Sequence, residues 1–316
     1  MSKKKITIIA PSAFGYSNYI LGALKGYDQL DAGIIYLDSP VFFYKNVFHR
    51  LHNVLSKLFL NNNLKKSFVS KRILKYLNDH GEQDIVFIIR PDILDNKTLE
   101  QIRKLSKIFV AYYWDSIKRF PRKATILYFF DKVYSYDKND VENYKLFFLN
   151  NYIFNENIVT VTPEFLFFNI STNDYRLPFL ENLTAYIAQK GWSKKILVYN
   201  GSEMPTKHVK LITKQKSTKD VSSLISKCKI IIEIQRVEQI GLSFRVFEAL
   251  GQRKKLITTN KDIVSYDFYN PQNILVIDQE HIIIPSDFVD SSYVDVPDEI
   301  LAPYRIENWV KNILLS

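Results

Sequence analysis

The 316-residue sequence has few cysteines, few glycines and no long apolar run. Its single cysteine, Cys228, can form neither an internal disulfide nor a cysteine metal cluster, which fits a reducing compartment. The sequence has only nine glycines, so we do not expect a phosphate-binding loop built from repeated glycines. No stretch approaches the roughly 18 apolar residues that span a bilayer. The start, MSKKKITIIAP, indicates a basic tip and a first core strand, not a signal peptide, so we expect a cytoplasmic protein.

Acidic residues are scarce relative to basic ones, and the formal net charge is +10. Residues 41–78 contain eight Lys or Arg and no Asp or Glu. The charge suggests an anionic membrane surface, nucleic acid or phosphorylated substrates as partners. No nucleic-acid-binding motif is present, so no specific nucleic-acid partner is expected.

Segment 41–78 also carries an apolar stripe, which predicts an amphipathic basic helix followed by a second helix over Leu64–Leu77. Either the stripe packs on the domain core, or it docks on anionic lipid headgroups, each cation adding roughly 1 kcal/mol. The stripe consists of Tyr44, Val47, Phe48, Leu51, Leu55 and Leu58, with Lys45, Arg50 and Lys57 off it.

Short apolar runs alternate with amphipathic stretches along most of the chain, which predicts an α/β fold. The length favours two domains. Residues 148–163 have the composition of a junction. We therefore expect domains over residues 1–160 and 161–303, and a closing helix over 304–316.

The stretch from Lys229 to Asn260 predicts a strand, a turn, a helix and a second strand. Lys229–Ile234 is a β-branched apolar run typical of a strand covered on both faces. The helix is expected over Ser243–Leu250, closed by Gly251, with its N-terminus at the carboxyl edge of the sheet, where a phosphate is favoured. Arg245 and Glu248 share one helix face. They can hold a phosphate and a ribose, or they can pair with each other.

The segment QIGLSFRVFEALGQRKKLITTN, from Gln239 to Asn260, resembles the donor-binding segment of bacterial GT-B glycosyltransferases of lipopolysaccharide and capsular polysaccharide biosynthesis. The resemblance continues in DFYNPQNI at 267–274, YWDS at 113–116 and YSYD at 134–137. It implies two doubly wound Rossmann-like domains facing a cleft, with the closing helix packed back on the first. One position departs: many retaining members carry two glutamates eight apart, and Ile240 stands eight before Glu248.

The resemblance implies a nucleotide sugar, most simply a UDP-sugar, bound by the second domain. No cofactor and no metal are expected, because the sequence has no Asp-x-Asp for a divalent cation. Arg245, Arg176 and the helix N-terminus would then neutralise the leaving diphosphate. The expected donor-binding residues are Gln239, Gly241, Leu242, Ser243, Arg245, Glu248, Asn173, Arg176 and Lys214.

Asp92 and Asp115 follow predicted strands and are the candidate catalytic acids of the first half. An inverting enzyme needs a base for the acceptor hydroxyl, and Asp115 is preferred over Asp92. A retaining enzyme needs none, because the leaving phosphate can take the proton. Each aspartate can instead cap a helix or pair with a cation such as Lys118 or Arg119.

The predicted function is transfer of a hexosyl group from a nucleotide sugar to a growing cell-surface glycan: lipopolysaccharide, O-antigen or capsule. The acceptor would be a glycan or lipid-linked glycan, and the enzyme would work in the cytoplasm, peripherally on the inner face of a bacterial membrane. The alternatives are a nucleic-acid or anionic-surface binding module, a sugar-nucleotide epimerase, and a polyol-phosphate transferase.

Overall fold

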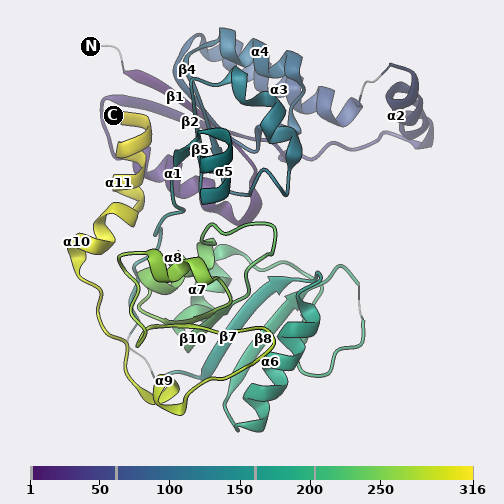
Figure 1. Ribbon diagram of the computed structural model, residues 1–316. Coiled ribbons are helices and arrows are strands. Elements are labelled where there is room, and N and C mark those ends of the chain that lie inside the picture. Colours follow the sequence, from purple (N-terminus) through teal and green to yellow (C-terminus); the bar gives the residue numbers. More distant parts are fainter. Residues whose placement is uncertain (1–2, 61–62, 160–161, 203, 316) are drawn as a thin grey trace. The chain divides into compact units, whose positions relative to one another are not determined.

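The computed structural model describes residues 3–60, 63–159, 162–202 and 204–315 and divides the chain into two compact units (Figure 1). The first unit comprises Met1–Leu149 and Val310–Ser316, and the second comprises Asn150–Trp309. The boundary thus falls at residue 149, where the sequence suggested 160, and the chain rejoins the first unit at Val310, where the sequence suggested 304.

The first unit is built on a sheet of six parallel strands over the described residues, in the order β2-β1-β3-β4-β5-β6. On one face, Ile73 and Leu77 of α3 and Leu99 of α4 pack in the core with strand residues such as Ile88. The strands are β1 (Lys4–Ala10), β2 (Leu30–Tyr36), β3 (Gln83–Ile89), β4 (Ser106–Tyr113), β5 (Lys132–Ser135) and β6 (Phe147–Phe148). The helices are α1 (Tyr16–Lys25), α2 (Val47–Leu60), α3 (Leu64–His80), α4 (Asn96–Lys104) and α5 (Lys138–Tyr144).

The second unit repeats this plan, with described strands in the order β12-β11-β10-β7-β8-β9, all parallel. The strands are β7 (Phe165–Thr172), β8 (Lys194–Tyr199), β9 (Lys210–Ile212), β10 (Cys228–Glu233), β11 (Lys255–Thr258) and β12 (Ile274–Val276). The helices are α6 (Leu177–Gln189), α7 (Thr218–Ser226), α8 (Phe244–Gly251), α9 (Ser286–Asp290), α10 (Asp298–Leu301) and α11 (Ile306–Val310).

Helices cover both faces of the second sheet, and β10 shows why its sequence is apolar throughout. Ile231 packs in one core with Val246 and Phe247 of α8. Its neighbours Ile230 and Ile232 point to the opposite core, which contains residues of α6. All three are fully buried, as expected for a central strand of a parallel sheet. The predicted double cover is confirmed, and the fold is that of two doubly wound α/β units.

The helix α5 ends at Tyr144. Lys145 adopts a left-handed conformation (φ 54°), which terminates the helix. Phe147 and Phe148 then pair with β5 as an edge strand, where aromatic side chains are favoured.

Gly251 does not close α8 from outside, as predicted, but is its last residue. The left-handed residue that follows is Arg253, at φ 51°. A Cβ on Gly251 would lie 2.3 Å from the Asn155 carbonyl oxygen and 2.7 Å from Ile153 Cγ2. The glycine is therefore explained by a close backbone approach.

The closing helix predicted over 304–316 is helical over Ile306–Leu315, where α11 continues directly into a π-helical turn. A 3-10 turn over Ala302–Tyr304 precedes α11, and a π turn over Lys311–Leu315 follows it. Pro303 lies in the first turn, where it cannot donate a backbone hydrogen bond. Among the described residues, no helix combines the length and hydropathy that a membrane crossing requires.

Candidate functional site

The strand order of the second unit reverses between β7 and β10, because β8 and β9 extend to one side and β11 and β12 to the other. Ligands of doubly wound sheets bind beyond the carboxyl ends of the strands at such a switch point. Two loops lie there: residues 173–176 after β7, and residues 234–243 after β10. These loops contain most of the donor-binding residues expected from the sequence.

The loop after β10 is held in place by hydrogen bonds to its backbone carbonyl groups. Each of the four carbonyls from Gln239 to Leu242 accepts a hydrogen bond from a side-chain amide of the same unit. The donors are Gln235 Nε2 for Gln239 and Gly241, Asn260 Nδ2 for Ile240, and Asn151 Nδ2 for Leu242, each at 2.9 Å. In a trans peptide the next N–H points opposite to the carbonyl. The N–H groups of Leu242 and Ser243 therefore point away from these amides, just ahead of α8.

Ser243 is the N-cap of α8 but makes no capping hydrogen bond with its side chain. Its hydroxyl instead donates to Glu233 Oε1 at 3.2 Å. The first turn of α8 therefore receives no serine cap, which leaves the helix dipole and the aligned N–H groups as an anion-binding arrangement. Gly241 and Leu242 are buried, and Leu242 packs in the core, so these two residues could contact a ligand only through their backbone groups.

Glu233, which the sequence analysis did not single out, ends β10 beneath this turn and is 6% exposed. It also accepts a 2.6 Å hydrogen bond from Thr258 Oγ1. Burial raises the pKa of Glu233, while these two hydroxyls and the charges of Arg176 and Arg245 oppose the shift. The carboxyl group ties the ends of β10 and β11 to the start of α8. An acid at the end of the run KIIIE was the available signal.

Arg245 and Glu248 pair with each other: Arg245 Nη1 donates to Glu248 Oε2. The Glu248 side chain is 2% exposed and that of Arg245 16%. Burial raises the pKa of Glu248, and Arg245 counteracts this. The alternative of an ion pair is therefore realised, but as a buried pair. A ribose contact by Glu248 requires this pair to open.

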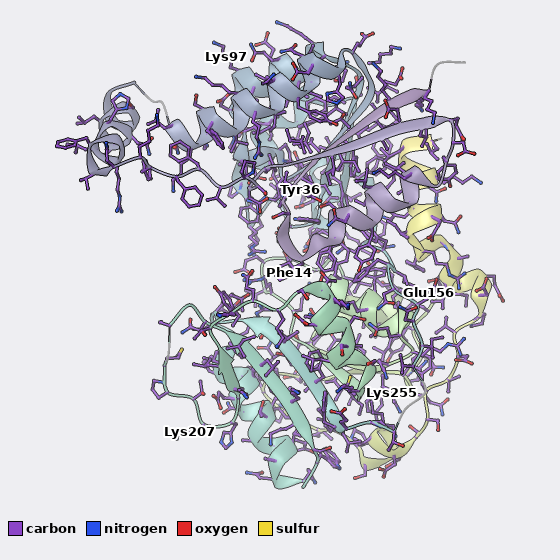
Figure 2. All side chains as sticks on the ribbon, turned by 180° about the vertical axis from the view of Figure 1, so that it is seen from behind. Phe14, Tyr36, Lys97, Glu156, Lys207 and Lys255 are labelled. Carbon is purple, nitrogen blue, oxygen red and sulfur yellow. The ribbon has the colours of Figure 1, made fainter. Side chains whose placement is uncertain are left out.

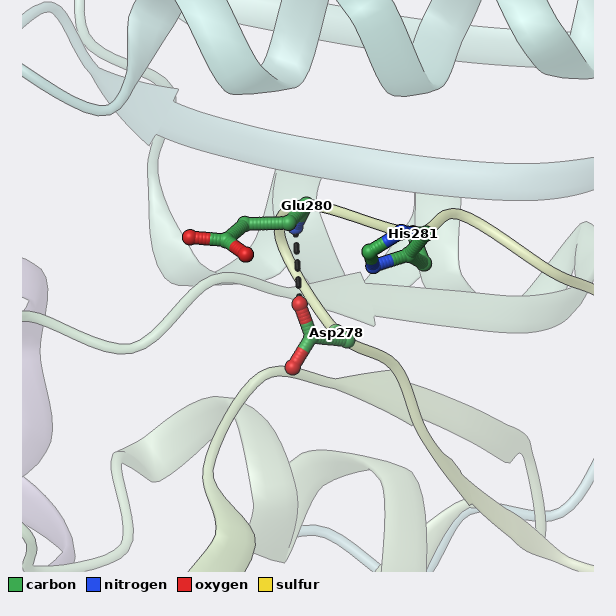
Figure 3. A group of neighbouring side chains, drawn as sticks. All are labelled: Asp278, Glu280 and His281. Carbon is green, nitrogen blue, oxygen red and sulfur yellow. Dashed lines mark hydrogen bonds between the residues drawn. The ribbon is translucent and has the colours of Figure 1, made fainter.

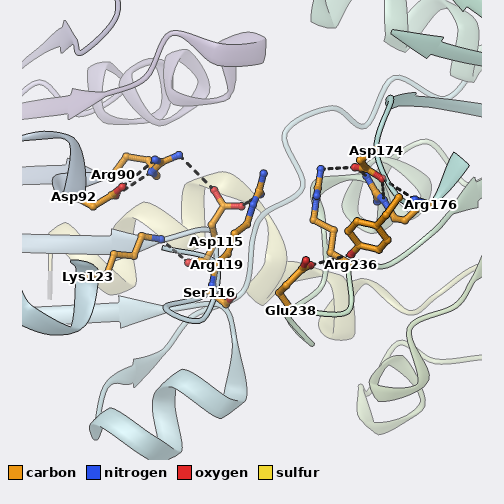
Figure 4. Close-up of polar contacts among 11 residues, drawn as sticks. Arg90, Asp92, Asp115, Ser116, Arg119, Lys123, Asp174, Arg176, Arg236 and Glu238 are labelled. Carbon is orange, nitrogen blue, oxygen red and sulfur yellow. Dashed lines mark hydrogen bonds and ion pairs between the residues drawn. The ribbon is translucent and has the colours of Figure 1, made fainter. Parts of the chain in front are cut away.

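Arg176 lies at the carboxyl end of β7, where Figure 4 shows it among polar side chains of both loops. It grips Asp174 with two hydrogen bonds of 2.9 and 2.8 Å and donates to the Ile234 carbonyl at 2.5 Å. Arg236 Nη2 lies 2.7 Å from the same carboxylate. Burial disfavours ionisation of Asp174, but the bonds and charges of Arg176 and the charge of Arg236 lower its pKa. The two arginines share this one carboxylate, and Glu238 of the loop after β10 accepts a 2.9 Å hydrogen bond from the Tyr175 hydroxyl beside them.

The remaining predicted donor residues lie on three loops. Asn173 donates to Asn200 Oδ1 at 3.2 Å. Lys214 is exposed in the loop after β9. Gln239 Oε1 is buried and has no hydrogen-bond partner among the described residues. A buried acceptor without a donor costs free energy unless a ligand or water supplies the hydrogen bond. Among the residues expected to bind the donor, Gln239 therefore has a side-chain acceptor still available to a ligand.

In the first unit, Asp92 and Asp115 follow β3 and β4 (Figure 4). Arg90 binds Asp92 with two hydrogen bonds of 2.9 Å and lies 4.0 Å from Asp115. Arg119 Nη1 also donates to Asp115. The Asp92 side chain is 8% exposed and that of Asp115 is 14% exposed. Both are paired carboxylates, and Asp115 is the more accessible.

The loop that carries Asp115 is held from beneath by Lys123, whose Nζ donates to the Asp115 carbonyl at 2.5 Å. Lys123 is fully buried, and burial lowers its pKa to about 8 against the opposing charges of Asp115 and Asp92. Asp140 accepts from the Ile117 N–H at 2.8 Å and fixes the same loop on its other side. Sequence reasoning missed Lys123 because nothing in a sequence marks a lysine as buried.

Asp278, Glu280 and His281 form a group of potential metal ligands (Figure 3). All three are exposed. Asp278 accepts from the Glu280 N–H at 2.8 Å and lies 3.4 Å from Lys261 Nζ. Such an arrangement is an ordinary surface turn and does not by itself define a metal site.

No protein-family model matches the chain, and a search of curated proteins finds no match. Solved structures do match over nearly the full length. One is an alpha-glucosyltransferase in complex with UDP and a 13-mer DNA, with 12% identity, 98% of this chain and 94% of that chain covered, and a TM-score of 0.57.

Two further matches are enzymes from named bacteria. A UDP-GlcNAc 2-epimerase from Neisseria meningitidis bound to UDP-GlcNAc shares 12% identity over 99% of this chain and 98% of that chain, with a TM-score of 0.51. An alpha,alpha-trehalose-phosphate synthase (UDP-forming) from Burkholderia vietnamiensis shares 8% identity over 99% and 97%, with a TM-score of 0.52. At these identities the likeness shows the fold, which is the two-domain GT-B fold of glycosyltransferases and sugar-nucleotide epimerases.

Proposed function

We propose that the protein is a metal-independent glycosyltransferase that moves a hexosyl group from a UDP-sugar to a cell-surface glycan. The observation that carries the proposal is the loop after β10, whose carbonyls are turned inward by three amide side chains ahead of the uncapped start of α8. This arrangement presents N–H groups at a switch point, where a diphosphate is bound most favourably. The UDP and UDP-sugar ligands of the matched structures support this choice of donor.

The roles follow from charge and position. Arg245, Arg176 and the N-terminus of α8 would neutralise the diphosphate as it leaves. Gln239 Oε1 would accept a hydrogen bond from the nucleotide. Glu248 would accept a hydrogen bond from a ribose hydroxyl once the Arg245 side chain turns away from Glu248 and binds the phosphate. Asn173 and Lys214 would border the nucleotide from the loops after β7 and β9.

In the transfer step, the acceptor hydroxyl oxygen forms a bond to the anomeric carbon. The bond from that carbon to the phosphate oxygen breaks, and UDP leaves with the electron pair. In an inverting reaction Asp115 would take the hydroxyl proton, with Asp92 the second choice. In a retaining reaction the leaving phosphate would take it. The closeness of the segment 239–260 to enzymes of lipopolysaccharide and capsule biosynthesis supports a glycan or lipid-linked glycan acceptor on the cytoplasmic side of a membrane.

The donor is tested by a thermal-shift screen with UDP, GDP, ADP, CDP and CMP, with and without EDTA. A melting temperature raised by UDP and unaffected by EDTA is expected. Gln239→Leu should weaken UDP binding without lowering the stability of the free protein, since its Oε1 has no described partner to lose. Gln252→Leu is the matched control, because Gln252 also carries a buried atom without a partner. Equal UDP affinity in wild type and Gln239→Leu would remove Gln239 from the site.

The reaction is tested with UDP-sugars and a mixture of glycan acceptors. A transferase releases UDP in step with glycan formation. An epimerase, the class of one matched structure, instead converts the nucleotide sugar into its epimer with no net release of UDP. Epimer formation without UDP release would therefore replace the proposed activity with the alternative one.

A further inference from the structure

The helix α2 of the first unit exposes large apolar side chains and buries two polar ones. Val47 is 80% exposed and Phe48 is 81% exposed, whereas Asn53 is 1% exposed and Ser56 is 4% exposed. This is the reverse of a helix that packs on a protein core. The interpretation that the stripe of segment 41–78 packs on the domain core is therefore wrong for Val47, Phe48, Leu51 and Leu55. Tyr44 is half-buried, and the side chain of Leu58 lies outside the described ones.

The inward side of α2 is fixed by hydrogen bonds to its own flanks. Asn53 Nδ2 donates to the Tyr44 hydroxyl at 2.6 Å, and Asn53 Oδ1 accepts from the Leu64 N–H at 2.8 Å. These bonds tie the helix to the segment before it and to the start of α3. The outward direction of the apolar side chains is thus set by specific contacts.

Five apolar side chains of α2 are exposed: Val47, Phe48, Leu51, Val54 and Leu55. At about 100° per residue, these five positions fall within an arc of about 120° on the helix, so they form one continuous face. Phe43, 78% exposed, extends the surface on the preceding segment. Figures 1 and 2 show α2 standing off from the sheet and the other helices of the first unit. We call this surface the α2 face, and it consists of Val47, Phe48, Leu51, Val54 and Leu55.

The segment that carries the α2 face is rich in basic residues and lacks acidic ones. Residues 41–78 contain eight Lys or Arg and no Asp or Glu. Those with exposed side chains include Lys45, Arg50, Lys65 and Lys71. On the helix, Arg50 lies on the border of the apolar arc. Large apolar side chains bordered by cations are the pattern of a helix that lies in the plane of an anionic membrane surface.

We propose that the α2 face inserts into the headgroup and acyl boundary of an anionic lipid surface, while the cations of segment 41–78 bind the lipid headgroups. Nucleic acid would be contacted by the cations but would leave five apolar side chains in water. A protein partner or a second copy would cover the apolar face but would have no general need for an acid-free border. The lipid surface satisfies both features together. The inference does not rest on the nucleotide site.

The test is flotation of the full-length protein with vesicles of phosphatidylcholine alone and of phosphatidylcholine mixed with phosphatidylglycerol. The variants Val47→Asp and Phe48→Asp change the α2 face. The matched controls, Val264→Asp and Phe147→Asp, change side chains that are 53% and 54% exposed elsewhere. Because all four side chains are largely in water, none of the variants should unfold, and circular dichroism checks this.

The wild type should float with the anionic vesicles, less so at high salt. Val47→Asp and Phe48→Asp should each lower the partition coefficient by about tenfold or more, the equivalent of one large apolar side chain left in water. The controls should bind as the wild type does. Absence of vesicle binding by the wild type at low salt would overturn the proposal, as would equal loss in face variants and controls.

The charged border is tested by Arg50→Glu and Lys45→Glu against Lys97→Glu and Lys207→Glu, which make the same charge change at exposed lysines elsewhere (Figure 2). Loss of one cation near the membrane is worth about fivefold in binding, and reversal of its charge is worth more. Arg50→Glu and Lys45→Glu should therefore each weaken vesicle binding by more than about fivefold. Equal weakening in the second pair would mean that net charge alone drives binding, which contradicts the proposal. Binding to duplex DNA without vesicle binding, or dimers that Phe48→Asp dissociates, would assign the α2 face to those partners instead.

Discussion

Replacing Arg245 with Met should destabilise the second unit in a pH-dependent way. Glu248 is 2% exposed, and Arg245 is the group that counteracts the effect of burial on its pKa. Removing one partner of a buried ion pair costs about 3–5 kcal/mol, because the remaining charge is left uncompensated. We therefore expect a loss of that order in the free energy of unfolding of Arg245→Met at neutral pH.

The sign of the pH dependence follows from proton binding. In Arg245→Met the folded-state pKa of Glu248 rises further above its unfolded value of about 4.3. The folded state then binds more protons than the unfolded state between those two values, so stability falls as pH rises through that window. The defect should shrink on acidification toward the unfolded pKa. The double variant Arg245→Met/Glu248→Leu should recover most of the loss, since apolar replacement of a buried pair is often neutral.

The assay is urea unfolding of wild type, the single variant and the double variant at acidic, neutral and mildly alkaline pH. The matched control is Lys104→Met, which breaks an exposed pair with Glu100 of 70% and 59% exposure and should change stability little. An Arg245→Met protein as stable as the wild type, or a defect that does not vary with pH, would refute the argument that Glu248 is a buried, paired carboxylate.

Three further predictions concern single positions. Gln235→Ala removes the donor to two loop carbonyls and should cost about 1–3 kcal/mol in unfolding free energy and weaken UDP binding; unchanged affinity would separate the loop from the site. Gly251→Ala should destabilise by about 1–3 kcal/mol, because its Cβ would meet the Asn155 carbonyl at 2.3 Å, whereas Gly22→Ala, in α1 with open space, should stabilise by about 0.5–1 kcal/mol. Lys123 has a pKa lowered to about 8, so the wild type should gain stability as pH rises from about 8 toward the unfolded value of about 10.4, and Lys123→Met should lose that slope.

The strands, and their burial on both faces, could be predicted from the sequence because strands of parallel sheets are short β-branched apolar runs. The run at β10 is apolar at every position that the two cores require. The edge strand β6 could not be predicted, because a strand of two residues, Phe147–Phe148, carries almost no pattern. Gly251 was misinterpreted because a C-terminal cap and a close backbone approach select the same residue.

The candidate site could be predicted as a location but not as a set of interactions. Position on the sheet edge follows from the strand–turn–helix pattern around Gln239 to Glu248. Which side chains pair depends on small differences in distance that a sequence does not contain. In the structure, Glu248 pairs with Arg245 and Asp174 pairs with Arg176. Amide donors such as Asn151 and Asn260 come from distant segments, so no local pattern reveals that they hold the loop before α8.

The most direct test of the account is a crystal structure of the protein grown with UDP and without divalent cations. The account predicts that the diphosphate lies at the N-terminus of α8, within hydrogen-bond distance of the N–H groups of Leu242 and Ser243, with Arg245 turned from Glu248 toward it. A diphosphate bound elsewhere in the second unit, or protein saturated with UDP whose Arg245–Glu248 pair is intact and whose α8 N-terminus is empty, would contradict it.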